Sequence, residues 1–202
     1  MKARRSSKFL IAMSVLCLVT ISAVTAIAVY AAQTITGSGS TTVSYTALGE
    51  VMGTIKATTI SGTTETPWGE AVTYNGKEAD GTTTSPLADN EITLTKQNKS
   101  IVYKFEFSNS ASSAVANKGY KIDLKYTASG TNTNVKVSYA IDSETSYTED
   151  ATLTVPQQEV NSTSATKIIF IKVEIVEILE NASFGGTFDW TLTANEIGRA
   201  HV

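Results

Sequence analysis

The sequence predicts an all-β fold, an antiparallel β-sandwich of the jelly-roll kind, preceded by one N-terminal hydrophobic helix. Three observations lead to this prediction. Several segments alternate apolar and polar residues with period two, which indicates sheets with one dry face and one wet face. The body is rich in Thr, Val, Ile and Tyr, which suit strands, and the whole chain has only 3 prolines. We count eight to ten such segments and find no amphipathic helix. A length of 202 residues allows a single domain.

Residues 1–32 have the form of a signal peptide or membrane anchor. A basic start with Lys2, Arg4, Arg5 and Lys8 precedes an uncharged run over residues 9–32. This order and the small residues at its end are typical of a secretory signal, and we expect cleavage after Ala31 or Ala32. The run is also long enough to span a bilayer, so an uncleaved anchor is the alternative. Both predict a secreted, extracellular or cell-surface protein.

The mature body divides into two parts. Residues 33–53 are predicted to be an extended polar N-terminal segment, and its first part, residues 33–44, is interrupted by Gly and Ser and expected to be flexible. Residues 54–195 are predicted to form the sandwich. Within it, residues 54–61 and 71–74 are expected to be strands, and an Asn-Gly turn signal follows the second of them. Residues 79–90 are predicted to be a polar loop.

The later strands have the clearest alternation. The apolar members of four segments follow at every second position: Ile101, Tyr103, Phe105, Phe107; Tyr120, Ile122, Leu124, Tyr126; Val135, Val137, Tyr139, Ile141; and Phe188, Trp190, Leu192. Residues 168–179 are predicted to be a long strand with a bulge near Ile175, because the apolar phase reverses there and β-branched residues are dense.

Composition argues against an enzyme. Four of the 16 basic residues lie before the apolar run, which leaves 12 against 19 acidic residues, a poor surface for nucleic acid. Cys17 lies inside the apolar run, and His201 is the only histidine. We therefore expect no catalytic residues, no metal site and no cofactor. Calcium bound by loop carboxylates, with Asp80, Asp89 and Asp142 as candidates, is left open.

The last seven residues, 196–202, look like the translation of a short-read sequencing adapter. We expect them to be an artefact that takes no part in the fold; a genuine polar tail is the alternative. With this tail set aside, the mature body has no histidine at all.

Two further groups of residues are candidates for surface function. Asn98, Asn161 and Asn181 each begin an Asn-X-Ser/Thr sequon in a predicted turn and are candidate glycosylation sites. Trp190 is expected in the core. Trp68 is expected to fold over the sandwich edge. Exposure of Trp68 or Tyr74 would instead favour a monomeric cell-surface adhesin or carbohydrate-binding module.

The overall pattern resembles biofilm fibre proteins of the TasA/camelysin kind and archaeal bundling-pilus or thread subunits. The shared features are a signal peptide, a polar extended segment, a cysteine-free Ser/Thr-rich body and a final strand within residues 186–194. The resemblance implies a structural subunit of a surface filament or biofilm matrix. In such a homo-oligomer, a segment of one copy adds a strand to the next. On this hypothesis residues 34–45 are the donor, with Ile35, Val43 and Tyr45 as its anchors.

Overall fold

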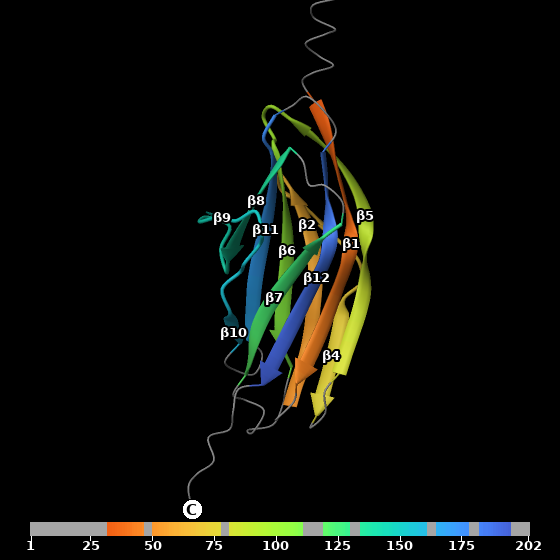
Figure 1. Cartoon of the computed structure of the whole chain (residues 1–202), viewed down its shortest axis with the longest axis vertical. Coiled ribbons are helices and arrows are strands. Elements are labelled where there is room, and N and C mark those ends of the chain that lie inside the picture. Colours follow the sequence, from red (N-terminus) through yellow and green to blue (C-terminus); the bar gives the residue numbers. More distant parts are fainter. Residues whose placement is uncertain are drawn as a thin grey trace, which may run out of the picture.

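The protein folds as a β-sandwich of two packed sheets (Figure 1). The computed structural model describes residues 32–46, 50–77, 81–110, 119–129, 134–160, 165–177 and 182–194. These ranges contain strands and no helix, so none of the described structure is a helix that could cross a bilayer. The predicted all-β sandwich is confirmed. The expected N-terminal helix and the last seven residues lie outside the described residues.

The strands divide into a five-stranded sheet A and a seven-stranded sheet B. Sheet A contains, in spatial order, β10 (Gln158–Val160), β7 (Tyr120–Ala128), β12 (Ala182–Ala194), β1 (Ala32–Thr46) and β5 (Gly81–Thr95). Sheet B contains β3 (Thr64–Pro67), β2 (Glu50–Ser61), β6 (Ser100–Asn109), β11 (Thr166–Ile175), β8 (Val135–Ile141) and β9 (Thr148–Glu149), and β4 (Val72–Lys77) also pairs with β2. Described neighbours are antiparallel, except that β1 runs parallel to β12.

The predicted alternation places the core correctly. Ile101, Tyr103, Phe105 and Phe107 of β6 are all 0% exposed, and they face the other sheet. Aromatic rings join the two layers, because Phe105 lies 4.9 Å from Phe188 between ring centroids. The predicted long strand over residues 168–179 ends at Ile175, where the bulge was expected. Burial of this apolar set supplies most of the driving force for folding.

Trp68 lies in the loop between β3 and β4 and closes one edge of the sandwich. Its side chain is 1% exposed, and its ring centroid lies 4.0 Å from that of Tyr103. The backbone N–H of Trp68 donates a hydrogen bond to the carbonyl of Ala57 at 2.8 Å. On the β5 side, the hydroxyl of Ser85 donates to the carbonyl of Glu70 at 3.3 Å. The loop therefore contacts β2 of sheet B and β5, the edge strand of sheet A.

Two long strands of the sandwich fall outside the strands predicted for its body. Residues 33–46 form most of β1, so the sandwich begins at Ala32 rather than at residue 54. Residues 81–90, expected to be a polar loop, form the first part of β5. The loop prediction was wrong because Pro86 and the acidic residues of β5 are tolerated on a strand with solvent on its outer side. The Asn75-Gly76 turn signal was also wrong, because both residues pair with β2.

Candidate functional site

Strand β1 is the candidate functional site, and its position in sheet A is unusual. It is the first described strand, yet it lies inside the sheet, parallel to β12 and antiparallel to β5 (Figure 1). Within the described part of the chain, β5 belongs to sheet A only through its pairing with β1. We call the space that β1 fills between β12 and β5 the β1 slot. The segment expected to project thus packs into its own chain here.

The β1 segment forms a strand because its odd-numbered and even-numbered residues have different environments. The predicted anchors Ile35 and Val43 are both 0% exposed in the core. Tyr45 is half-buried and packs against the same core. All three anchors therefore lie on one face of β1, as period-two geometry requires. They serve as core residues of this chain in the structure.

On the core face, β1 has small side chains at the positions where the neighbouring strand β12 has large ones. In the parallel register, Gly37 lies beside Phe184 and Thr41 beside Phe188. Both phenylalanines are 1% exposed or less and belong to the aromatic core. The ring of Phe184 also stacks on Tyr103 at 5.3 Å between centroids. The aromatic rings fill the space that larger β1 side chains would need, which is why β1 lacks a continuous apolar face.

Two polar side chains on the core face of β1 have no hydrogen-bond partner within the described residues. They are the amide of Gln33, 4% exposed, and the hydroxyl of Thr41, 2% exposed. A buried polar group left without a partner costs about 1–3 kcal/mol. Strand β1 therefore fits its slot less favourably than an apolar strand of the same shape would.

The outer face of β1 carries hydroxyl groups that pair across to β5. The Oγ1 atoms of Thr42 and Thr84 lie 3.0 Å apart, and Ser44 Oγ lies 3.3 Å from Thr82 Oγ1. These cross-strand pairs fix the register of β5 on β1 from the solvent side. They also place two pairs of side chains at an accessible surface, where they can be replaced without opening the core.

No protein-family model matches the chain, and no curated protein matches it in sequence. The candidate site therefore depends on the geometry of β1 and its slot.

Of the three candidate glycosylation residues, only Asn98 lies among the described residues. Asn98 lies in the turn between β5 and β6 and is half-buried. Its backbone N–H donates a hydrogen bond to the hydroxyl of Thr95 at 3.1 Å, and its side-chain Nδ2 donates to Ser61 Oγ at 3.4 Å. A glycan on Nδ2 would have to replace this second contact. Asn161 and Asn181 lie outside the described residues.

The carboxylates of the described residues do not gather into a metal site. No group of three or more His, Cys, Asp or Glu able to hold a metal occurs in the described ranges. Asp89 is exposed on β5. Asp142 binds the ammonium of Lys167 at 2.6 Å and accepts the backbone N–H of Ile168 at 3.2 Å. Asp80, the third calcium candidate, lies outside the described residues.

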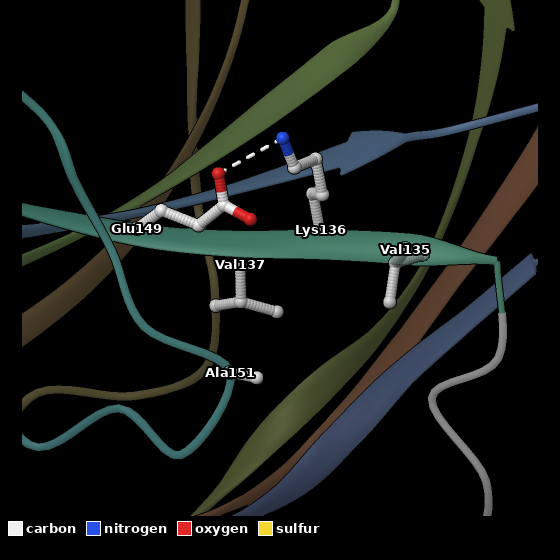
Figure 2. Close-up of a pocket in the computed structure, with 5 residues that line it drawn as sticks. All are labelled: Val135, Lys136, Val137, Glu149 and Ala151. Atoms are coloured by element: carbon white, nitrogen blue, oxygen red, sulfur yellow. Dashed lines mark ion pairs between the residues drawn. The ribbon is translucent and has the colours of Figure 1, made fainter.

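A hollow of about 190 Å³ lies beside β8 and β9 (Figure 2). It is lined by Val135, Lys136, Val137, Glu149 and Ala151. Lys136 and Glu149 form an ion pair at 2.8 Å, and the hydrogen bond to Glu149 raises the pKa of Lys136. Figure 2 shows the two valines pointing to the opposite side of the strand from this pair. The lining offers no nucleophile with a neighbouring base.

Proposed function

We propose that the protein is an extracellular structural protein, a subunit of a surface filament or biofilm matrix fibre that assembles by donating β1 to another copy. The observation that carries this proposal is that β1 is the first described strand and that, among the described strands, β5 pairs within sheet A with β1 alone. When β1 leaves, a slot one strand wide remains, lined by backbone groups of β12 and β5. Strand addition into such a slot supplies main-chain hydrogen bonds and side-chain register together.

The fit of β1 also supports exchange. The unpartnered groups of Gln33 and Thr41 lower the cost of withdrawing β1 from its slot, because water satisfies them once the strand is released. A second copy's β1 makes the same contacts in the slot. Exchange is therefore close to neutral in free energy, and local protein concentration decides between the two arrangements.

The short connection between β1 and β2 limits how far a donating copy can lie from the copy that receives its strand. Thr46 ends β1 and Glu50 begins β2, so an extended link spans at most about 14 Å. A donating copy must therefore place its sandwich close to the end of the slot that it fills. An open series of such contacts gives a filament, whereas a reciprocal exchange closes as a dimer. The resemblance to biofilm fibre proteins and archaeal bundling pili supports the open series.

A disulfide trap tests the proposal. Cysteines replace Thr42 and Thr84, whose hydroxyls lie 3.0 Å apart, in a chain whose Cys17 is changed to Ser. Side chains directly opposite on antiparallel strands are close enough for a disulfide bond. If β1 comes from a neighbour, oxidation of the assembled protein links copies, and a non-reducing gel shows a ladder of bands.

The matched control pair is Thr127 and Thr187, which face each other on β7 and β12. Cysteines there must form a bond within one chain in every arrangement. A ladder from the Thr42 and Thr84 pair alone, with filaments in electron micrographs, supports the proposal. Monomer bands from both pairs, with no filaments, refute it.

The carbohydrate-binding alternative depended on exposed aromatic residues, namely Trp68 and Tyr74. Both are only 1% exposed, so no observation favours that function.

A further inference from the structure

The β1 slot has no room for a side chain at Gly37. A Cβ atom there would overlap the amide oxygen of Asn90 and lie 2.5 Å from the hydroxyl of Tyr103. Tyr103 is 0% exposed and held between the rings of Trp68 and Phe184, so it has little freedom to withdraw. Any strand that enters the slot therefore needs glycine at this position.

Two residues later the obstacle is backbone. Gly39 has a φ of 148°, which residues with a side chain rarely adopt, and its Cβ would overlap the carbonyl oxygen of Gly186. Gly186 has a φ of 150°, and its own Cβ would overlap the carbonyl of Thr127 on β7. The backbones of β1, β12 and β7 thus approach one another closely at the same level of sheet A. Because carbonyl groups within a sheet cannot swing aside, no side-chain movement relieves this contact.

The register of the entering strand is fixed at the same height. The pairing of β1 with β5 shifts between Gly37 and Gly39, where β5 has one extra residue. A bulge of this kind pins a register. A slip by one residue would turn the core face of β1 to solvent, and a slip by two would bring Ile35 or Thr41 onto a glycine position. Only one register keeps both glycines in place.

The Gly-X-Gly spacing occurs once in the whole sequence, at residues 37–39. We propose that the β1 slot is selective for its own sequence, that Gly37 and Gly39 are the residues that determine this selectivity, and that the donated strand comes only from a second copy of this chain. This inference rests on the proposed function, because it names the partner and the specificity residues of the same site. A strand of equal β propensity without the two glycines is rejected.

Peptide competition tests the selectivity with the full chain. The chain is refolded from urea with about 1 mM of a labelled peptide that has the sequence of residues 32–46, since a tethered strand competes at roughly millimolar effective concentration. Incorporation is measured as label that co-elutes with the chain. Three further peptides carry Gly37→Ala, Gly39→Ala or, as the control on the outer face, Ser40→Ala.

The expected result is incorporation of the unmodified and Ser40→Ala peptides, with incorporation of both glycine variants at least tenfold lower. A chain carrying Asn90→Ala and Tyr103→Phe has space beside position 37. It should accept the Gly37→Ala peptide and still reject Gly39→Ala, whose obstacle is the Gly186 backbone. Equal incorporation of all four peptides overturns the selectivity while leaving strand exchange intact. Rejection of even the unmodified peptide overturns strand exchange itself.

Discussion

Replacement of Thr41 by valine should stabilise the protein, although it removes a polar group from the middle of a strand. The Thr41 side chain is 2% exposed and its hydroxyl has no described partner. Valine has nearly the same shape and leaves no buried hydroxyl. The penalty for such a group is about 1–3 kcal/mol, and we expect valine to recover about 1 kcal/mol of it. For a domain of this size that raises the melting temperature by about 2–4 °C.

Thr59→Val is the matched control for this prediction. Thr59 is also buried, at 6% exposure, but its hydroxyl donates to the carbonyl of Thr66 at 3.2 Å. The same chemical change there removes a hydrogen bond, so it should lower stability by about 0.5–1.5 kcal/mol. Heat and urea denaturation of both full-length variants measure the two effects. Shifts of the same sign would mean that Thr41 is satisfied and that β1 fits its slot as well as other strands do.

Three other perturbations have definite expected outcomes. Trp68→Ala should lower the free energy of unfolding by about 3–5 kcal/mol in urea denaturation, because it empties the closed edge of the sandwich. Burial raises the pKa of Tyr120 to about 12, so its contribution to stability is full below pH 10 and is lost between pH 10 and 12. Tyrosinate absorbance and unfolding midpoints across that range measure the loss. Lys136→Gln should leave the thermal midpoint unchanged, because the ion pair with Glu149 is exposed.

Each of these outcomes has a control or a contrary result. A loss below about 1 kcal/mol for Trp68→Ala would mean that the loop does not close the edge. Tyr120→Phe should remove part of the alkaline destabilisation, and its hydroxyl partner Tyr74, 2.5 Å away, should account for a further part. Burial raises the pKa of Tyr74 as well, so both phenols resist ionisation in the folded state. A stability that does not change up to pH 12 would contradict this account.

The sequence predicted the strands whose core faces are apolar throughout. Ile101 and Phe107 could be assigned because each neighbour on their face is also apolar, and both are 0% exposed. The same reasoning failed for β1, although its odd-numbered residues do face the core. Gly37 and Thr41 interrupt the apolar face because Phe184 and Phe188 occupy the space beside them. These two phenylalanines belong to β12, which pairs with β1 but is far from it in the sequence. Only the tertiary arrangement contains that information.

The local turn signals failed for a related reason. Asn75-Gly76 favours a tight hairpin, but its backbone groups instead complete the ladder with β2. Pro86 marks an edge strand as readily as a loop, and the bulge near it breaks the alternation of β5. The anchors Ile35 and Val43 were chosen correctly as inward residues. Whether they fill their own chain or another was beyond the sequence, because both arrangements bury the same side chains.

The parallel pairing of β1 with β12 orders the events of synthesis. Ile35 pairs with Ala182 and Tyr45 with Leu192. Strand β1 therefore cannot complete its pairing until β12, which is synthesised much later, is available. Contacts between distant parts of a chain form slowly. Newly made molecules therefore spend time with an unfilled slot and an unattached β1. Under the proposed strand donation, the local concentration of other copies during that interval decides how many molecules fill their own slot first.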